Sequence, residues 1–196
     1  MVRLVERSDG GRIKSSFRLN WDFTNRTGQM RTESILRELY GGLWHTTRVD
    51  RFEKILESGA ILPEPDIPEN ERWGTAIGQE GYPYVRTLGA VSLFDFCQFD
   101  RQTYDEKYPG SSLYYFVPCQ LQWDSAVWIG IDREKIAPGF ISAVELLKKW
   151  KSEKSYRRFM AEIEAAHLGP VPVSAFTRAF RVSKEDDQFV PLALTP

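Results

Sequence analysis

The sequence is poor in residues that hold metal ions through nitrogen or sulfur. Its 196 residues include two histidines, two cysteines and three methionines. Cys97 and Cys119 do not form the close, repeated spacings of structural zinc sites or of disulfide-rich secreted domains, and the two histidines are far apart in the sequence. We therefore expect no metal site, and we expect both cysteines to be reduced, buried thiols.

Long apolar runs and an excess of charge of either sign are also lacking. No segment approaches the roughly 18 apolar residues of a membrane-spanning helix, and the start of the chain, MVRLVERSDGGR, lacks the apolar core of a signal peptide. We therefore expect a cytoplasmic protein with no membrane partner. Because 26 Lys and Arg residues nearly balance 27 Asp and Glu residues, a polyanion would have to bind a local patch.

Three familiar motifs of nucleotide-binding proteins and hydrolases are absent. The sequence contains no G-x-x-x-x-G-K-S/T loop, no G-x-G-x-x-G fingerprint and no G-x-S-x-G nucleophile elbow. These absences exclude a P-loop nucleotidase and a Rossmann-type dinucleotide site. They also mean that no motif in the sequence supports a serine hydrolase.

The length and the hydrophobic content of the chain are sufficient for one folded domain. With 42% hydrophobic residues the chain can bury a substantial core. We expect an N-terminal arm at 1–40 and a folded domain at 41–196. In the arm, the alternating run FRLNWDF predicts a strand at 17–23, and RTESILREL predicts a helix at 31–39 with Thr32 as its N-cap.

In the domain, the hydrophobic patterns predict short strands and two capped helices. One helix follows Asp50 as its N-cap and ends at Gly59, and another begins at a capping box formed by Ser142 and Glu145 and runs to Trp150. The predicted strands lie at 43–47, 90–96, 113–118 and 126–131.

Three other segments have less regular patterns. Residues 63–84 are rich in Pro, Glu and Gly and predict a long loop, which in a compact domain is often a lid or binding loop. Residues 100–110 are charged and turn-like. The segment MAEIEAAHLG, at 160–169, alternates like a strand but is alanine-rich like a helix, and both remain open.

One of the two histidines lies in a short apolar run, LWHTT. On a strand, His45 and Thr47 would point to the same face. A neutral imidazole and a hydroxyl both donate and accept hydrogen bonds, so this pair could bind a ribose hydroxyl and an amide of a nucleotide. A semi-buried histidine with a local partner, beside an ordinary strand threonine, is the more common alternative.

Glu162 and Glu164 form an E-x-E pair. On a strand the two carboxylates would share a face, and crowding in a cleft would raise the pKa of one of them. Such a carboxylate could stabilise an oxocarbenium-like sugar. On a helix the two side chains would diverge as solvated surface residues.

Two further patterns allow a binding role or an ordinary structural one. In AVSLFDF, Ser92 either bonds to the backbone in the core or lines a site, and Phe94 either stacks on a base or nicotinamide ring or belongs to the core. The basic residues between 148 and 158, with Trp150 and Tyr156 among them, suit single-stranded nucleic acid. A solvated helix face is the more common reason for such a pattern.

The order of these segments resembles the ADP-ribosyltransferase superfamily, especially its DarT-like branch and related small prokaryotic defence or toxin-type domains. The most specific part is LWHTTRVDRFEKILESGAIL, which follows the family's H-x-T strand and helix with His45, Thr47, Asp50, Ile55 and Gly59. AVSLFDF is similar to the second core strand, and AEIEAAHLGPVP to the final catalytic segment.

This resemblance implies an α+β fold, with a split, mostly antiparallel sheet and flanking helices in a single domain. It implies NAD+ as a substrate bound between the halves of the sheet, no metal, and a nucleic acid or protein as the acceptor of ADP-ribose. The resemblance also implies that the protein acts in a toxin or phage-defence system, with an antitoxin or another partner protein. An NAD+ glycohydrolase and a non-catalytic binding module of the same fold are the alternatives.

The resemblance also assigns roles to residues. His45 and Thr47 would hold the ribose and carboxamide side of NAD+, with Ser92 beside them, and Phe94 would stack on nicotinamide. Glu164 would be the catalytic glutamate, with Glu162 in reserve. The phosphate-binding arginine of the long loop has two candidates, Arg72 and Arg86.

Overall fold

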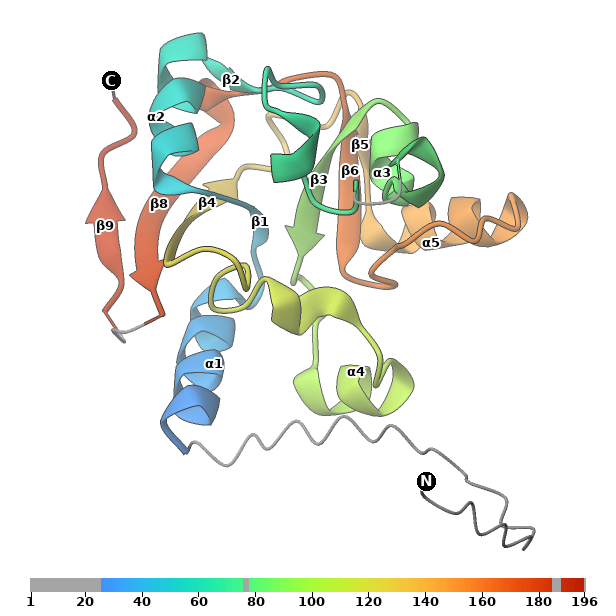
Figure 1. The fold of residues 1–196 in the computed structure, drawn as a ribbon, viewed down its shortest axis with the longest axis horizontal. Coiled ribbons are helices and arrows are strands. Elements are labelled where there is room, and N and C mark those ends of the chain that lie inside the picture. Colours follow the sequence, from blue (N-terminus) through green and yellow to red (C-terminus); the bar gives the residue numbers. More distant parts are fainter. Residues whose placement is uncertain (1–25, 76–77, 185–187, 196) are drawn as a thin grey trace, which may run out of the picture.

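The computed structural model describes residues 26–75, 78–184 and 188–195, and the strand predicted at 17–23 lies outside them. A seven-stranded sheet, in which every neighbouring pair is antiparallel, has the order β5-β6-β3-β1-β4-β8-β9 (Figure 1). These strands are β1 (Leu43–Thr47), β3 (Ala90–Asp95), β4 (Ser125–Ile131), β5 (Phe140–Ile141), β6 (Glu164–Leu168), β8 (Phe176–Ser183) and β9 (Val190–Leu192). A separate two-stranded sheet pairs β2 (Ala60–Ile61) with β7 (Val171–Pro172).

Helices flank the sheet, and short 3-10 turns connect the elements. The helices are α1 (Arg26–Leu39), α2 (Val49–Ser58), α3 (Tyr84–Thr87), α4 (Arg101–Lys107) and α5 (Ala143–Ser152). The 3-10 turns are η1 (Glu69–Glu71), η2 (Gly78–Gly81), η3 (Ser112–Tyr115) and η4 (Val173–Ala175). Figure 1 shows α1 and α2 on opposite sides of the strands.

The large sheet is split between β1 and β3. These strands pair only through Leu43 with Asp95 and Trp44 with Phe94. On its other side, β1 pairs with β4 from Trp44 to Thr47. The strands therefore part at His45, which divides β5-β6-β3 from β1-β4-β8-β9. The predicted α+β fold, with a split antiparallel sheet and flanking helices, is confirmed.

The core consists of a main layer on each face of the sheet, because side chains alternate along each strand. On β3, Leu93 joins the layer that contains Phe52 of α2, and Phe94 joins the layer that contains Leu36 of α1. A third, smaller cluster joins Leu146 of α5 to β6. Phe94 and Trp44, paired across the strands, thus lie on the face that α1 covers.

Several predicted elements are confirmed, with corrections at two helix starts. Gly59 ends α2 in the left-handed conformation at φ 76°, and the capping box that begins α5 is present. Thr32 is not an N-cap, because α1 already begins at Arg26. Asp50 lies inside the first turn of α2, whose N-cap position is Arg48.

Two predicted segments are wrong. Residues 113–118 form no strand, because Leu113 and Phe116 reach the core at a spacing of three from the turn η3. The charged segment 100–110 contains helix α4, capped by the Asp100 side chain, which accepts a hydrogen bond from the Thr103 amide. Charged residues suit this helix because most of its surface faces solvent.

The alternative at 160–169 is settled, because Glu164–Leu168 is strand β6. The prediction for the cysteines is half wrong. Both are free thiols, but Cys97 is exposed just after β3, whereas Cys119 is buried. Among the described residues, no helix is long and apolar enough to cross a membrane, and no three His, Cys, Asp or Glu side chains are grouped so that they could hold a metal ion.

Candidate active site

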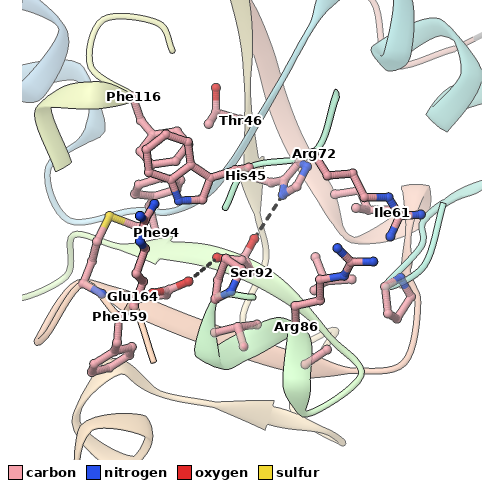
Figure 2. A pocket seen from close by; sticks show the side chains of 18 of the residues that line it. His45, Thr46, Ile61, Arg72, Arg86, Ser92, Phe94, Phe116, Phe159 and Glu164 are labelled. Atoms are coloured by element: carbon pink, nitrogen blue, oxygen red, sulfur yellow. Dashed lines mark hydrogen bonds between the residues drawn. The ribbon is translucent and has the colours of Figure 1, made fainter. Parts of the chain in front are cut away.

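His45, Ser92 and Glu164 meet at one cavity, although they come from three different strands. His45 Nδ1 lies 3.1 Å from the backbone oxygen of Ser92, and Ser92 Oγ donates to Glu164 Oε1 at 2.8 Å (Figure 2). The cavity measures about 240 Å³ and is lined by all three residues. It lies where β1 and β3 part, so the split in the sheet creates the space that these side chains share.

Glu164 is a buried acid, only 4% exposed at the start of β6. Its Oε2 accepts a hydrogen bond of 3.0 Å from the Met160 amide. Burial raises the pKa of Glu164 to about 7, because the bonds from Met160 and Ser92 offset only part of the cost of desolvating the carboxylate. Both protonation states are therefore populated near neutral pH.

His45 presents a defined tautomer. Because the Ser92 carbonyl can only accept, Nδ1 carries the proton and Nε2 is the acceptor. Burial lowers the pKa of His45, and the bond to the carbonyl opposes this only in part, so the ring is neutral at pH 7. Nε2 has no hydrogen bond within the described ranges and can accept one from a hydroxyl.

The threonines of β1 are arranged differently from the predicted His45–Thr47 pair. Thr46 lines the cavity with His45, and its buried Oγ1 has no hydrogen-bond partner among the described residues. Thr47 is also buried but lines an adjoining cavity of about 410 Å³. Alternation along an ideal strand put Thr46 on the opposite face from His45, so the sequence pattern did not indicate Thr46 as a site residue.

The two cavities share walls. Arg72, Trp73 and Phe116 line both of them, together with His45 and Thr46. The adjoining cavity extends to Arg51 and Lys54 of α2, and Arg51 is paired there with Glu71 at 2.8 Å. Glu164 lines the first cavity and not the adjoining one.

Phe94 lines the cavity and also belongs to the core. It is 4% exposed, and its ring centroid lies 5.3 Å from that of Trp128 and 5.5 Å from that of Phe116. Phe94 is thus a core residue that also forms part of the cavity wall, and its stacking on a ligand ring stays a prediction.

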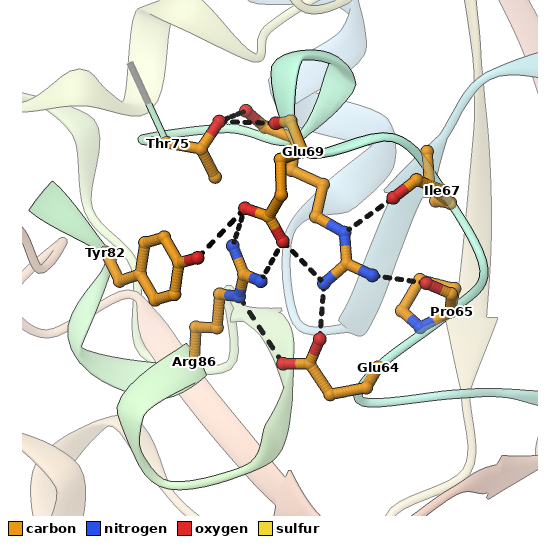
Figure 3. Close-up of polar contacts among 8 residues, drawn as sticks. Glu64, Pro65, Ile67, Glu69, Thr75, Tyr82 and Arg86 are labelled. Atoms are coloured by element: carbon orange, nitrogen blue, oxygen red, sulfur yellow. Dashed lines mark hydrogen bonds and ion pairs between the residues drawn. The ribbon is translucent and has the colours of Figure 1, made fainter. Parts of the chain in front are cut away.

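Both candidate arginines, Arg72 in the long loop and Arg86 on α3, line the cavity, but nearby carboxylates bind them. Arg86 Nη2 and Nη1 lie 2.6 and 3.0 Å from the two carboxylate oxygens of Glu69, and Arg72 pairs with Glu64 (Figure 3). Tyr82 also donates to Glu69 at 3.0 Å. The Arg86 guanidinium and the Tyr82 hydroxyl lower the pKa of Glu69, so its negative charge persists at neutral pH.

Glu162 and Glu164 are not a same-face pair. Glu162 lies in the turn before β6, at φ 63°, with its exposed side chain paired to Lys107. It does not line the cavity. Of the two glutamates, only Glu164 lies with His45 and Ser92.

The segment before β6 contributes cavity residues that sequence reasoning missed as site residues. Arg158, Phe159 and Met160 line the cavity beside Glu164. Of the basic residues between 148 and 158, Arg157 donates to the backbone oxygen of Gln79 at 2.7 Å. The basic pattern was visible in the sequence, but which of its members face a cavity depends on the tertiary fold.

Comparison with known proteins finds no matching family model and no matching curated protein. Among solved structures, a mutant of the A subunit of heat-labile enterotoxin, studied for the flexibility of its active-site loop, is similar at a TM-score of 0.39 and 16% identity. The match covers 79% of this chain and 75% of the enterotoxin chain.

Proposed function

We propose that the chain is an NAD+-dependent ADP-ribosyltransferase that modifies a nucleic acid or a protein. The observation that supports this most is the meeting of His45, Ser92 and Glu164 at one cavity. The sequence resemblance assigns these positions to NAD+ binding and catalysis, and nothing in their sequence spacing requires them to be neighbours.

In the proposed complex NAD+ occupies the two adjoining cavities at the split of the sheet. His45 Nε2 accepts a hydrogen bond from a ribose hydroxyl, and the hydroxyl of Thr46, which has no partner in the described part of the chain, gains one from the ligand. Thr47 serves the part of the ligand in the adjoining cavity. Phe94 provides an apolar wall for nicotinamide.

Glu164 is the proposed catalytic residue. As the bond between nicotinamide N1 and ribose C1′ breaks, its electron pair leaves with nicotinamide and positive charge develops on the sugar. An ionised Glu164 stabilises that charge, held in place by Ser92 and Met160. An acceptor oxygen or nitrogen then bonds to C1′, and its proton passes to the carboxylate.

The test is release of nicotinamide from NAD+ by the purified chain, with and without single-stranded DNA, RNA or protein extract. Release that depends on an acceptor, with ADP-ribose found on that acceptor, supports a transferase and names its substrate class. Release without any acceptor indicates a glycohydrolase. If the chain neither binds NAD+ nor releases nicotinamide, the enzyme proposal is overturned in favour of a binding module.

The DarT-like resemblance extends the proposal to a cytoplasmic toxin or phage-defence role, with an antitoxin or other partner protein. Expression of the chain in bacteria tests this role. Wild type should slow growth, and Glu164→Gln at equal protein level should not. Equal growth of both strains would count against toxicity.

A further inference from the structure

Three arginines line the cavity that holds Glu164: Arg72, Arg86 and Arg158. Two of them already have anionic partners. Arg86 binds both carboxylate oxygens of Glu69, and Arg72 binds Glu64 and donates from Nε to the Ile67 backbone oxygen at 3.2 Å. An added phosphate would have to compete with carboxylates that are already in place.

Arg158 differs from the other two. Arg158 is an exposed residue whose guanidinium has no hydrogen bond or ion pair within the described ranges, although its backbone is well anchored. The Tyr84 amide donates to the Arg158 carbonyl at 2.9 Å, and the next ring, Phe159, packs against Tyr84 and Trp150. A fixed backbone with an unpaired cationic side chain suits recognition of an anion.

The position of Arg158 relative to Glu164 indicates which anionic group of a ligand the guanidinium would contact. Met160, two residues further along, donates its amide to Glu164 Oε2, so the Cα of Arg158 lies within about 7 Å along the chain from that anchor. Arg158 and Glu164 line the same cavity, and the bond from Met160 brings the backbone beside Arg158 close to the buried acid. In NAD+, the diphosphate is attached to C5′ of the ribose whose C1′ would react.

We infer that Arg158, rather than Arg72 or Arg86, binds the diphosphate of NAD+. This inference rests on the proposed function and replaces the loop arginines as the phosphate anchor. The guanidinium fork donates two hydrogen bonds to phosphate oxygens, which a lysine cannot reproduce in the same geometry. Arg72 and Arg86 hold the loop in place through Glu64 and Glu69.

The experiment measures binding of NAD+, ADP-ribose and nicotinamide to the full chain by calorimetry. The variants are Arg158→Gln, Arg158→Lys and the matched control Arg181→Gln, since Arg181 is an exposed arginine on β8 that lines neither cavity. For Arg158→Gln we expect the Kd of NAD+ and of ADP-ribose to rise about tenfold or more. Nicotinamide, which has no phosphate, should bind as it does to wild type.

Arg158→Lys should fall between wild type and Arg158→Gln, and Arg181→Gln should bind all three ligands like wild type. Thermal melting of each variant verifies that it is folded. If wild type binds NAD+ and Arg158→Gln binds it equally well, the inference is overturned and the proposed function stands. Equal weakening of nicotinamide also overturns it, as does an effect confined to single-stranded oligonucleotides.

Failure of the proposed function gives a different result. In that case wild type binds none of NAD+, ADP-ribose and nicotinamide, and the assignment of Arg158 falls with it. Titrations of NAD+ at two salt concentrations add a second readout. The affinity of wild type should fall more steeply with salt than that of Arg158→Gln, because the variant has lost a charge that contacts phosphate.

Discussion

Ser92 donates a hydrogen bond to Glu164 from the neighbouring strand, with 2.8 Å between Ser92 Oγ and Glu164 Oε1. The second carboxylate oxygen accepts from the Met160 amide. The buried acid is thus held at both oxygens by the protein, so its position in the cavity does not depend on a ligand. A carboxylate fixed in this way loses little entropy when it acts on a developing positive charge.

The stability of the protein should depend on pH through Glu164. In the folded protein this carboxyl has a pKa of about 7, whereas its ordinary value is 4.5. Between these values the unfolded chain binds fewer protons than the folded protein, so the free energy of unfolding decreases as the pH rises from about 4.5 to about 7. Glu164→Gln cannot ionise and should lack this decrease.

At pH 8 we therefore expect Glu164→Gln to be more stable than wild type, by up to about 3 kcal/mol. At pH 4.5 the two proteins should be alike, because the glutamine oxygen can accept from the Met160 amide while its NH2 group donates to Ser92 Oγ. Urea unfolding at the two pH values provides the measurement. Parallel stability profiles for the two proteins would show that Glu164 does not have a raised pKa.

Ser92→Ala should change the pH dependence of activity. The Ser92 hydroxyl lowers the pKa of Glu164, so its removal should raise that pKa further above the ordinary value. The rising limb of the pH profile of nicotinamide release should move to higher pH, with a slower rate at pH 7. Ser174→Ala, at an exposed site on η4, is the control. An unshifted profile for Ser92→Ala would argue against the proposed role of this hydrogen bond.

The sequence predicted the central strands and the residues that meet on them. β1 and β3 each follow a glycine, and β3 is a dense apolar run, which is a reliable signal of a buried strand. The E-x-E segment was ambiguous because its alternation is typical of a strand, whereas its alanines favour a helix. Pairing of β6 with β3 decides the matter, and that pairing is a tertiary effect.

Other parts of the site could not be predicted locally. Thr46 reaches the cavity because β1 and β3 part after Trp44. The alternation of side chains along a strand does not predict where two paired strands separate. The sequence also did not distinguish Arg72 and Arg86 from Arg158. Whether a cation already has a carboxylate partner depends on how a long loop folds back on itself.

The long loop should lose order when its ion pairs are removed. Glu69 binds both Arg86 and Tyr82, so Glu69→Gln should free one end of the loop. We expect faster tryptic cleavage after Arg72, with little change in global stability, because exposed ion pairs contribute little to the free energy of unfolding. Glu53→Gln, at an exposed position on α2, is the matched control. Equal cleavage rates for the two variants would mean that Glu69 does not hold the loop.

Leu93→Ala should destabilise the fold. Leu93 is fully buried on the face of β3 opposite Ser92, and it packs with Phe52 and Ile129. Removing its side chain should cost about 3 kcal/mol, from lost burial and from the cavity that remains. Urea unfolding at constant pH measures this loss. A loss below about 1 kcal/mol would mean that this face of the sheet is poorly packed.

The most direct test of the proposed site is nicotinamide release by Glu164→Gln and Glu162→Gln, side by side with wild type. Both variants remove one carboxylate from the same E-x-E pair, but only Glu164 lines the cavity. We expect Glu164→Gln to lose release by a factor of about a hundred or more, while Glu162→Gln stays within about threefold of wild type. Full activity of Glu164→Gln in a folded protein would contradict the assignment of Glu164 as the catalytic residue.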